Sequence, residues 1–232
     1  MLIKHRWILV ILILMAAAPI HAKVVKHQYD RAQRAADVLQ SLTGTPEKGI
    51  PKGLLDDAKG IAVFPHVVKG AFVIGGSWGK GLLSVRERNG NWGAPIYVDL
   101  AGGSYGFQIG AEATDLVLVF RSEHGVKSML SSKLKLGADA SVAAGPVGRT
   151  AQAATDVKLN AEILAYSRSK GVFAGIALDG AVISLDNSAN EKVYGMDGKQ
   201  VLAHPRASSP VTKAFQAALL RYSPGPSTAT TQ

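Results

Sequence analysis

The sequence contains no cysteine, and its N-terminal apolar run is too short to cross a membrane. Without cysteine there are no disulfide bonds, so a folded domain must be held together by its hydrophobic core. The absence also excludes a bacterial lipoprotein, because lipid attachment needs a cysteine at the cleavage site. The apolar run, Ile8–Ala18, falls well short of the roughly 20 residues that span a bilayer. Any membrane attachment must therefore come through a folded surface.

Side chains that bind metals or act as paired acids and bases occur without a useful pattern. The histidines beyond residue 22 lie far apart, at positions 27, 66, 124 and 204, and none has a second ligand at a suitable spacing on one element. Asp56 and Asp57 are adjacent, so on a helix their side chains diverge. We therefore expect no cofactor. A metal site assembled from distant positions is the alternative that the sequence leaves open.

The first 22 residues have the three parts of a cleavable secretory signal. Lys4 and Arg6 form a positive start, Ile8–Ala18 is the apolar centre, and Ala22 is a small residue suited to cleavage. Ile20, three positions before the cut, fits the small-residue rule only loosely. The pattern predicts export and cleavage after residue 22. The alternative is an uncleaved anchor, against which the short apolar run argues.

Removal of residues 1–22 leaves 210 residues, and the formal net charge falls from +9 to +7 because that segment holds two basic and no acidic residues. This length suits one domain with a sizeable core, and no linker or fixed-period repeat divides it. We expect the domain at 23–222 and a disordered Pro/Ser/Thr-rich tail at 223–232. The basic balance indicates an anionic partner, such as phospholipid or nucleic acid, or only a soluble surface.

Helical spacing appears near both ends of this domain and at its centre. Residues 24–43 carry apolar residues at steps of three and four, namely Val25, Tyr29, Ala32, Ala36 and Leu39. Another side of this helix carries His27, Arg31 and Arg34. Further helices are predicted at Lys52–Lys59, Ser122–Ser132 and from Ser209 to about Tyr222.

Between these helices the apolar period changes to two, which is typical of strands. Asn89-Gly90 is a strong hairpin signal, and the glycine clusters suit bulges and bends in a curved sheet. The first strands resemble an antiparallel meander. The predicted strands are Gly60–Phe64 (closed by Pro65), Ala71–Ile74, Leu82–Arg88, Ala94–Leu100, Ser104–Ala111, Asp115–Arg121, Ala161–Ser167, Gly171–Leu178 and Ala181–Leu185. The sequence thus predicts an α+β fold: one domain with a curved, mostly antiparallel, glycine-rich sheet, barrel- or sandwich-like, packed with N-terminal, central and C-terminal helices.

Two glycine-rich segments match catalytic motifs only in part. Ser77 and Ser104 each lie in a G-x-S-x-G pattern, but strand-like sequence follows where a nucleophile elbow needs a helix. Gly79-Lys80 resembles the end of a phosphate-binding loop, but Gly81 stands where that motif needs Ser or Thr. We interpret these glycines as structural and expect no enzyme activity. A serine hydrolase is the minor alternative.

Basic residues are the best candidates for a binding site. Nucleic acid is disfavoured, because no aromatic residues interleave with them, whereas a basic helix with an apolar stripe suits a membrane surface. The same stripe also suits docking on the sheet, and the charges also suit a solvated surface. Lys133 and Lys135, two apart, would share one face of a strand. The candidate lipid contacts are Lys23, Lys26, Arg31 and Arg34, followed by Lys52, Lys133 and Lys135.

A series of phrases along the chain resembles the SYLF domain family, a lipid-binding module of bacteria and of eukaryotic endocytic proteins. The phrases occur in order over about residues 25–222. They are Ala58–Pro65, Gly75-Gly76 with Gly79 and Gly81, Trp92–Pro95, Gly102–Gly110, Thr114–Val119, Gly145–Arg149, Tyr166–Gly171, Phe173–Gly175, Leu178–Gly180 and Tyr194-Gly195.

The resemblance implies an α+β domain with a curved sheet, no established enzyme activity, and binding to anionic phospholipid through a basic surface that includes the N-terminal helical region. Some eukaryotic members also bind actin. No SH3 or FYVE domain accompanies this domain, so an endocytic role does not follow. For an exported, periplasmic protein attached peripherally to the membrane, the expected lipids are bacterial: phosphatidylglycerol, cardiolipin or lipopolysaccharide phosphates. The alternative is an envelope protein-interaction or structural module with a protein partner. The oligomeric state stays open.

Overall fold

The computed structural model describes residues 25–41, 49–70, 75–104, 112–131, 133–147, 160–169, 172–176 and 178–224. The predicted signal segment 1–22, Lys23, most of the predicted tail, the predicted strand Ala71–Ile74 and all but the first residue of the predicted strand Ser104–Ala111 lie outside these ranges.

Nine strands form one curved sheet, in the order β5-β9-β3-β2-β1-β4-β7-β6, with β8 paired to β7. All pairs are antiparallel except β6 with β7. The bounds are β1 Gly60–Gly70, β2 Gly75–Val85, β3 Ile96–Ser104, β4 Glu112–Phe120, β5 Lys133–Lys135, β6 Val142–Ala144, β7 Ile163–Ser169, β8 Val172–Gly175 and β9 Val182–Leu185. The predicted α+β class and the curved, mostly antiparallel sheet are confirmed.

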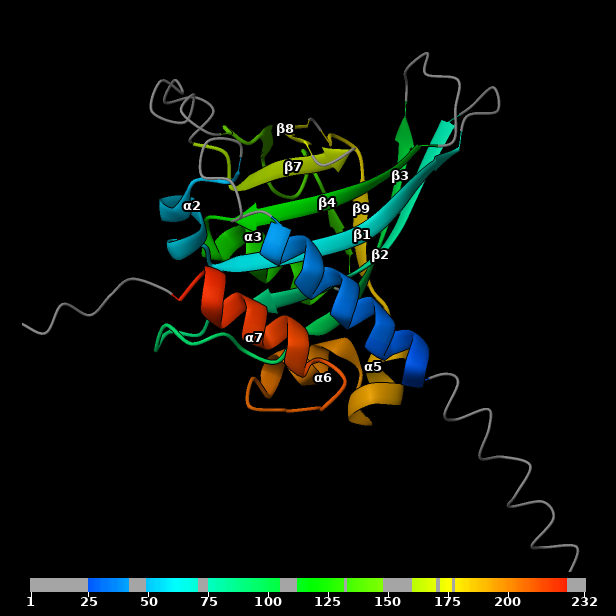
Figure 1. Ribbon diagram of the computed structural model, residues 1–232, viewed down its shortest axis with the longest axis vertical. Coiled ribbons are helices and arrows are strands. Elements are labelled where there is room, and N and C mark those ends of the chain that lie inside the picture. The colour runs from blue at the N-terminus through cyan, green and yellow to red at the C-terminus, as the bar shows by residue number, and fades with distance from the viewer. Residues whose placement is uncertain are drawn as a thin grey trace, which may run out of the picture.

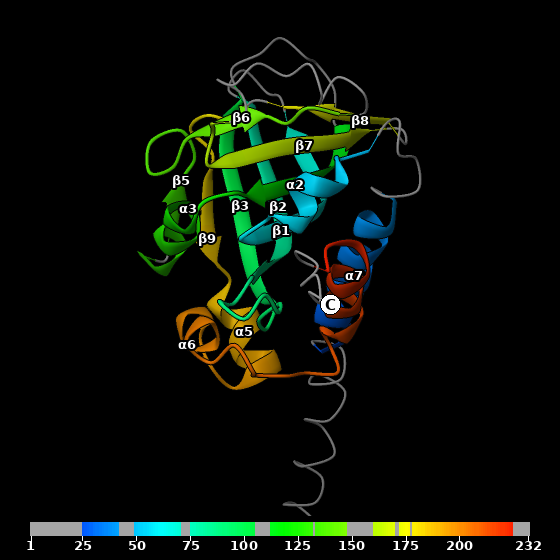
Figure 2. The same ribbon diagram turned by 90° about the vertical axis from the view of Figure 1, so that its left-hand side faces the viewer.

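Helices cover one face of the sheet and close its ends. The N-terminal helix, residues 25–41, lies beside α7 across one face, as both Figure 1 and Figure 2 show. The remaining helices pack at the ends of the strands (Figure 2). The bounds are α2 Lys52–Asp56, α3 Glu123–Ser128, the 3-10 turn η1 Met129–Ser131, α5 Asn187–Tyr194, α6 Gly198–Ala203 and α7 Lys213–Tyr222.

The alternation of strand side chains produces a core on each face of the sheet. On one face, Ile61 and Val63 pack in a cluster with the N-terminal helix and with Phe215 of α7. On the concave face, Ala62 and Phe64 belong to a second cluster, which α6 and η1 help to close. The sheet is therefore a half-barrel with a packed interior and a helical cover outside.

The sequence predicted that Pro65 ends the first strand, but the strand continues beyond this residue. β1 continues to Gly70, and its register shifts between Phe64 and Val67 toward one neighbour and between Val63 and Val68 toward the other. Within this bulge His66 has a φ of 61°, and its N–H bonds the Asp115 carboxylate at 3.1 Å. Because Pro65 lies in the bulge, its missing N–H removes no ladder bond.

The glycine cluster 75–81 lies inside β2 and is not a bend between strands. β2 pairs with β3 without a shift from Gly75 to Leu83. At Gly81 a Cβ would lie 2.3 Å from the Val63 carbonyl and 2.6 Å from the Phe64 ring. The glycines thus admit neighbouring groups into the curved sheet. The predicted meander is also wrong beyond β3, because β4 pairs with β1.

Local signals in other places are confirmed. Gly90, with a φ of 85°, closes the predicted hairpin by donating to the Glu87 carbonyl at 2.9 Å. Ser122 caps α3 by accepting from the Gly125 N–H at 2.9 Å. α2 is shorter than predicted because it ends at Asp56.

Candidate functional site

The candidate site is the outward face of two adjacent helices, the N-terminal helix 25–41 and α7, here called the helical layer. Its inner residues pack on the sheet: Ala32, Ala35 and Leu39 of the first helix and Phe215 and Leu219 of α7 are buried. Burial on one side leaves the opposite side of each helix facing outward. The side chains on that side decide what the layer can bind.

The N-terminal helix contributes two of the predicted cations to this face. Lys26 and Arg34 are exposed, while Lys23 lies outside the described residues. Eight residues of helix separate the two by about 12 Å along the axis. Asp37 is also exposed and accepts a hydrogen bond from Gln33 at 3.2 Å, and Asp30 is partly exposed on the same helix. The two exposed cations of this helix are therefore matched by two carboxylates, and the face is mixed in charge.

Arg31 is not a surface contact, which corrects the prediction. Its side chain is only 3% exposed, and both terminal nitrogens lie 3.1 Å from the Asp186 carboxylate. The guanidinium also stands over the Tyr97 ring, 5.0 Å from its centroid. Gln28, Arg31 and Ala35 are buried together with Ala32, Ala36 and Leu39 of the predicted stripe, so the buried side of the helix is wider than that stripe. Tyr29, a member of the predicted apolar stripe, is 48% exposed and does not pack on the sheet.

Asp186 joins this buried cation to Lys80, a cation with an exposed side chain. It caps α5 by accepting from the Ala189 N–H and lies 3.3 Å from Lys80, which also pairs with Asp99 at 2.9 Å. Burial alone would raise the pKa of Asp186, but the Ala189 N–H and the charges of Arg31 and Lys80 hold it below its usual value. Burial likewise opposes the charge on Lys80, yet Asp99 and Asp186 raise the pKa of that ammonium. These charges therefore hold the fold together.

The remaining predicted residues do not join the helical layer. Lys133 and Lys135 share the outer side of β5, with Leu134 buried between them, as their spacing predicted. Figure 2 places β5 across the molecule from the helical layer. Lys52 lies on α2 and forms an ion pair with Asp56. The predicted residues that the structure describes thus do not form one surface, because β5 and the helical layer lie on opposite sides of the molecule (Figure 2).

α7 also contributes to this face, which the sequence did not lead us to expect. Its exposed residues are Lys213, Ala217, Leu220 and Arg221, with Leu220 51% exposed. Their steps of four, three and one place them on one side of the helix. An apolar side chain between two cations is typical of a helix at a membrane interface. The spacing of Lys213, Leu220 and Arg221 was visible in the sequence, but only the helix itself was predicted from this segment and not its exposed side.

The sheet also carries two exposed apolar side chains that are neighbours. Val68 of β1 and Trp78 of β2 are cross-strand partners, 41% and 59% exposed. The Trp78 ring lies over Gly76, where an added Cβ would approach it within 2.5 Å. Glycine at 76 therefore lets the indole lie flat on its own strand.

Both candidate catalytic serines lie in paired strands, and Ser104 is the last residue of β3, opposite Gly75. The Ser77 hydroxyl donates to the Gly102 carbonyl at 3.3 Å within paired strands. Within the described ranges, no three His, Asp or Glu side chains gather as they would around a metal ion. None of the described helices has both the length and the apolar composition that a bilayer crossing requires.

Comparison with known proteins reveals the family. Residues 101–222 match the family model Ysc84, described as "Las17-binding protein actin regulator". This match covers more than half of the chain. The chain belongs to the Ysc84 family, which confirms the SYLF resemblance.

Curated Ysc84 relatives are longer than this chain. LAS seventeen-binding protein 3 of Saccharomyces cerevisiae is 35% identical over 184 residues, which are 75% of this chain and 40% of that protein. Protein YSC84 of the same yeast is 34% identical over 198 residues, 79% of this chain and 42% of the relative. SH3 domain-containing YSC84-like protein 1 of Xenopus laevis is 34% identical over 172 residues, which are 72% of this chain and 51% of that protein. The chain thus spans about half, or less, of these relatives.

The Ysc84 match maps onto a continuous part of the fold. It begins within β3 and ends at Tyr222, the last residue of α7. It therefore includes the α7 half of the helical layer, with Lys213, Leu220 and Arg221.

Proposed function

We propose that this Ysc84-family chain is a peripheral membrane protein that docks on anionic lipid through the helical layer. The observation that carries the proposal is the outward side of α7, where half-exposed Leu220 stands between Lys213 and Arg221. Lys26 and Arg34 lie on the adjacent helix, and Tyr29 adds a second half-exposed apolar body. Cations with apolar side chains between them suit the boundary between headgroups and acyl chains.

We expect the chain to bind an anionic membrane with moderate affinity. Each Lys or Arg near an anionic surface contributes about 1 kcal/mol, so four supply about 4 kcal/mol, which alone corresponds to a Kd of about 1 mM. Burying the exposed parts of Leu220 and Tyr29 adds roughly 2 kcal/mol, which brings the Kd to about 40 µM. Binding of this kind is reversible and weakens with salt.

Export is part of the proposal, because residues 1–22 have the pattern of a secretory signal. In a bacterial envelope the anionic lipids are phosphatidylglycerol, cardiolipin and the phosphates of lipopolysaccharide. No enzyme activity is proposed.

A protein partner is the second candidate, favoured by the names of the relatives. The family description refers to Las17 binding and actin regulation, and the yeast relative's name refers to Las17 binding. Those names belong to proteins about twice as long or longer. For this chain the same helical layer would then be a protein contact, and binding would not depend on lipid charge.

Co-sedimentation of residues 23–232 with vesicles tests the function. Vesicles of phosphatidylethanolamine with increasing phosphatidylglycerol should retain increasing amounts of protein at low salt, and moderate salt should release it. Retention that does not vary with phosphatidylglycerol, or no retention at low salt, would contradict anionic docking and favour the protein-partner candidate.

A further inference from the structure

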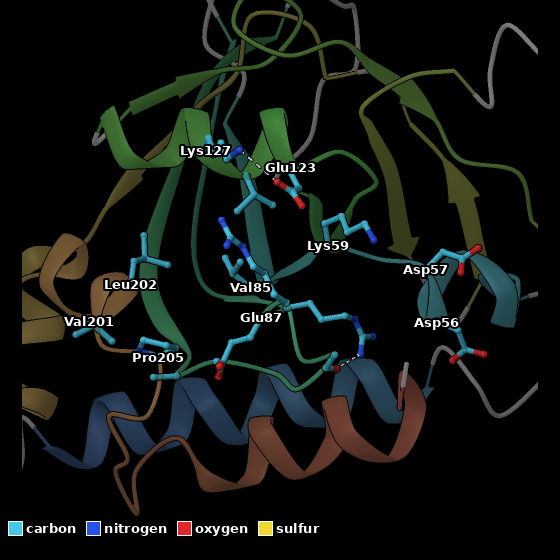
Figure 3. Close-up of a pocket in the computed structure, with 16 residues that line it drawn as sticks. Asp56, Asp57, Lys59, Val85, Glu87, Glu123, Lys127, Val201, Leu202 and Pro205 are labelled. Carbon is cyan, nitrogen blue, oxygen red and sulfur yellow. Dashed lines mark hydrogen bonds and ion pairs between the residues drawn. The ribbon is translucent and has the colours of Figure 1, made fainter. Parts of the chain in front are cut away.

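The structure contains a cavity of about 540 Å³, and no described residue of the helical layer lines it. It opens between α3, α6, the loop after α2 and the hairpin at residues 86–92 (Figure 3). Its volume lies within the range of sites that hold small organic ligands.

The lining has an apolar side and a charged side. Leu202, Val201 and Pro205 from the α6 region lie together on one side, whereas Lys59 and Asp57 lie on the other (Figure 3). Val85 continues the apolar lining at the end of β2. A ligand that fills this cavity must therefore be apolar at one end and polar at the other.

Of the eight charged side chains among the described residues of the lining, three form ion pairs: Glu123 with Lys127, and Asp56 with Lys52 of α2. Lys127 pairs with Glu123 at 3.2 Å, across the top of the cavity in Figure 3. Arg86 donates to the carbonyls of Ala58, Gly90 and Ser223 at 2.9, 2.8 and 3.0 Å, and its guanidinium stands 4.2 Å from the centre of the Trp92 ring. Arg86 is therefore a structural clamp and has little capacity left for a ligand.

Two cations of the lining stay uncommitted. Within the described part of the chain, neither the Lys59 ammonium nor the Arg88 guanidinium has a hydrogen bond or ion pair, and both side chains are exposed. Glu87, Glu123, Asp56 and Asp57 also line the cavity. These carboxylates would repel a ligand with several negative charges, such as a nucleotide, but two free cations suit a single anionic group.

We propose that this cavity binds one anionic amphiphile, with an acyl chain against Val85, Val201, Leu202 and Pro205 and a carboxylate or phosphate headgroup at Lys59 and Arg88. This site is separate from the helical layer, so the chain would hold a single amphiphile independently of docking on a membrane surface.

Vesicle-free titration with dansylaminoundecanoic acid, a fluorescent fatty acid used below its micelle concentration, tests the site. The protein should bind one probe molecule saturably. Laurate and dodecyl phosphate should displace it, whereas dodecanol should require about tenfold more and millimolar inorganic phosphate should not displace it. Displacement by inorganic phosphate, or no saturable binding, would overturn the proposal.

Variants locate the binding. Lys59→Glu/Arg88→Glu changes only exposed side chains and should weaken probe binding by about tenfold or more. Leu202→Glu places a charge on the apolar side and should do the same. Lys133→Glu/Lys135→Glu, on the edge of the sheet, is the matched control and should leave the Kd unchanged. An unchanged Kd in Lys59→Glu/Arg88→Glu would refute the site even if Leu202→Glu fails to fold.

A further variant distinguishes the cavity site from membrane docking by the helical layer. Lys213→Glu/Arg221→Glu should abolish vesicle binding and keep probe binding. Loss of probe binding in that variant would assign the amphiphile to the helical layer and overturn the cavity site.

Discussion

Asp186 is a residue that joins several elements of the fold. Its carboxylate pairs with Arg31 of the N-terminal helix and Lys80 of β2, and it accepts the Ala189 N–H at the start of α5. One anion thus joins a helix, a strand and a second helix. Removing one partner of a buried pair leaves the other charge unsatisfied, so we expect these residues to be sensitive to substitution.

The pH dependence of stability should report this anion. The pKa of Asp186 in the folded chain lies below the ordinary 3.8, so its contribution is complete above that value and is lost as the pH falls through the folded pKa. Asp186→Asn should therefore lower the free energy of unfolding at pH 7, and the deficit should shrink below about pH 3.8. Urea unfolding of both proteins across this range measures it. A deficit independent of pH would contradict the assignment.

Glycine 81 should be intolerant of even one methyl group. Gly81→Ala places a Cβ against the Val63 carbonyl and the Phe64 ring, so we expect a loss of about 1–3 kcal/mol in the free energy of unfolding. Gly53→Ala is the control, since nothing lies within 4 Å of that Cβ in α2 and alanine favours a helix by about 1 kcal/mol. Equal effects in thermal melts would refute the steric explanation.

The position of single charges could be predicted only in part. Lys133 and Lys135 share a face because strand geometry places alternate residues together. Arg31 was placed on the wrong side because helical spacing alone does not say which of two flanks meets the sheet. Its partner Asp186 lies 155 residues away, and no local signal reports such a pair.

At the scale of elements, short-range signals were the most reliable. The Asn89-Gly90 hairpin and the Ser122 cap were predicted because a few neighbouring residues determine them. α5 and α6 were missed although a signal for α6 existed: Asp197 and Gln200 form a capping box. Pro65 was read as a strand end because a bulge that accommodates it depends on both neighbouring strands.

The edge strand β5 is capped by its own chain. Asp139 accepts the Lys135 N–H at 2.7 Å, and the Ser131 hydroxyl donates to the Lys133 carbonyl at 2.7 Å. Such capping and exposed lysines both discourage edge-to-edge pairing. Ser131→Ala/Asp139→Ala should therefore cause concentration-dependent self-association in light scattering. Ser128→Ala, which removes a hydroxyl that bonds only within the α3 region, is the control, and equal association there would contradict the edge mechanism.

For the whole molecule, the fold class could be predicted from the sequence, but the topology of the sheet could not. The alternating apolar period predicts strands and a curved sheet, and both are present. The strand order was not predictable, because β1 pairs with β4 and β3 with β9 across long stretches of chain. The helical layer depends on the same long-range packing, so only its separate helices were visible in the sequence.

Export makes a prediction about the intact chain. When the full sequence is expressed in a Gram-negative host, protein from the periplasmic fraction should begin at Lys23, since residues 1–22 carry the signal pattern. Intact mass spectrometry of that fraction measures the N-terminus. Protein that keeps residues 1–22, or that stays in the cytoplasm, would contradict export.

Vesicle binding by two matched double variants tests the central claim most directly. Lys213→Glu/Arg221→Glu reverses two cations in the helical layer, and Lys133→Glu/Lys135→Glu makes the same change in charge across the molecule on β5. If the helical layer docks on anionic lipid, the first variant should lose co-sedimentation with phosphatidylglycerol vesicles while the second keeps most of it, and both should melt cooperatively. Equal loss in both variants would show that only net charge matters. Full retention by the first variant would remove the helical layer from the membrane contact.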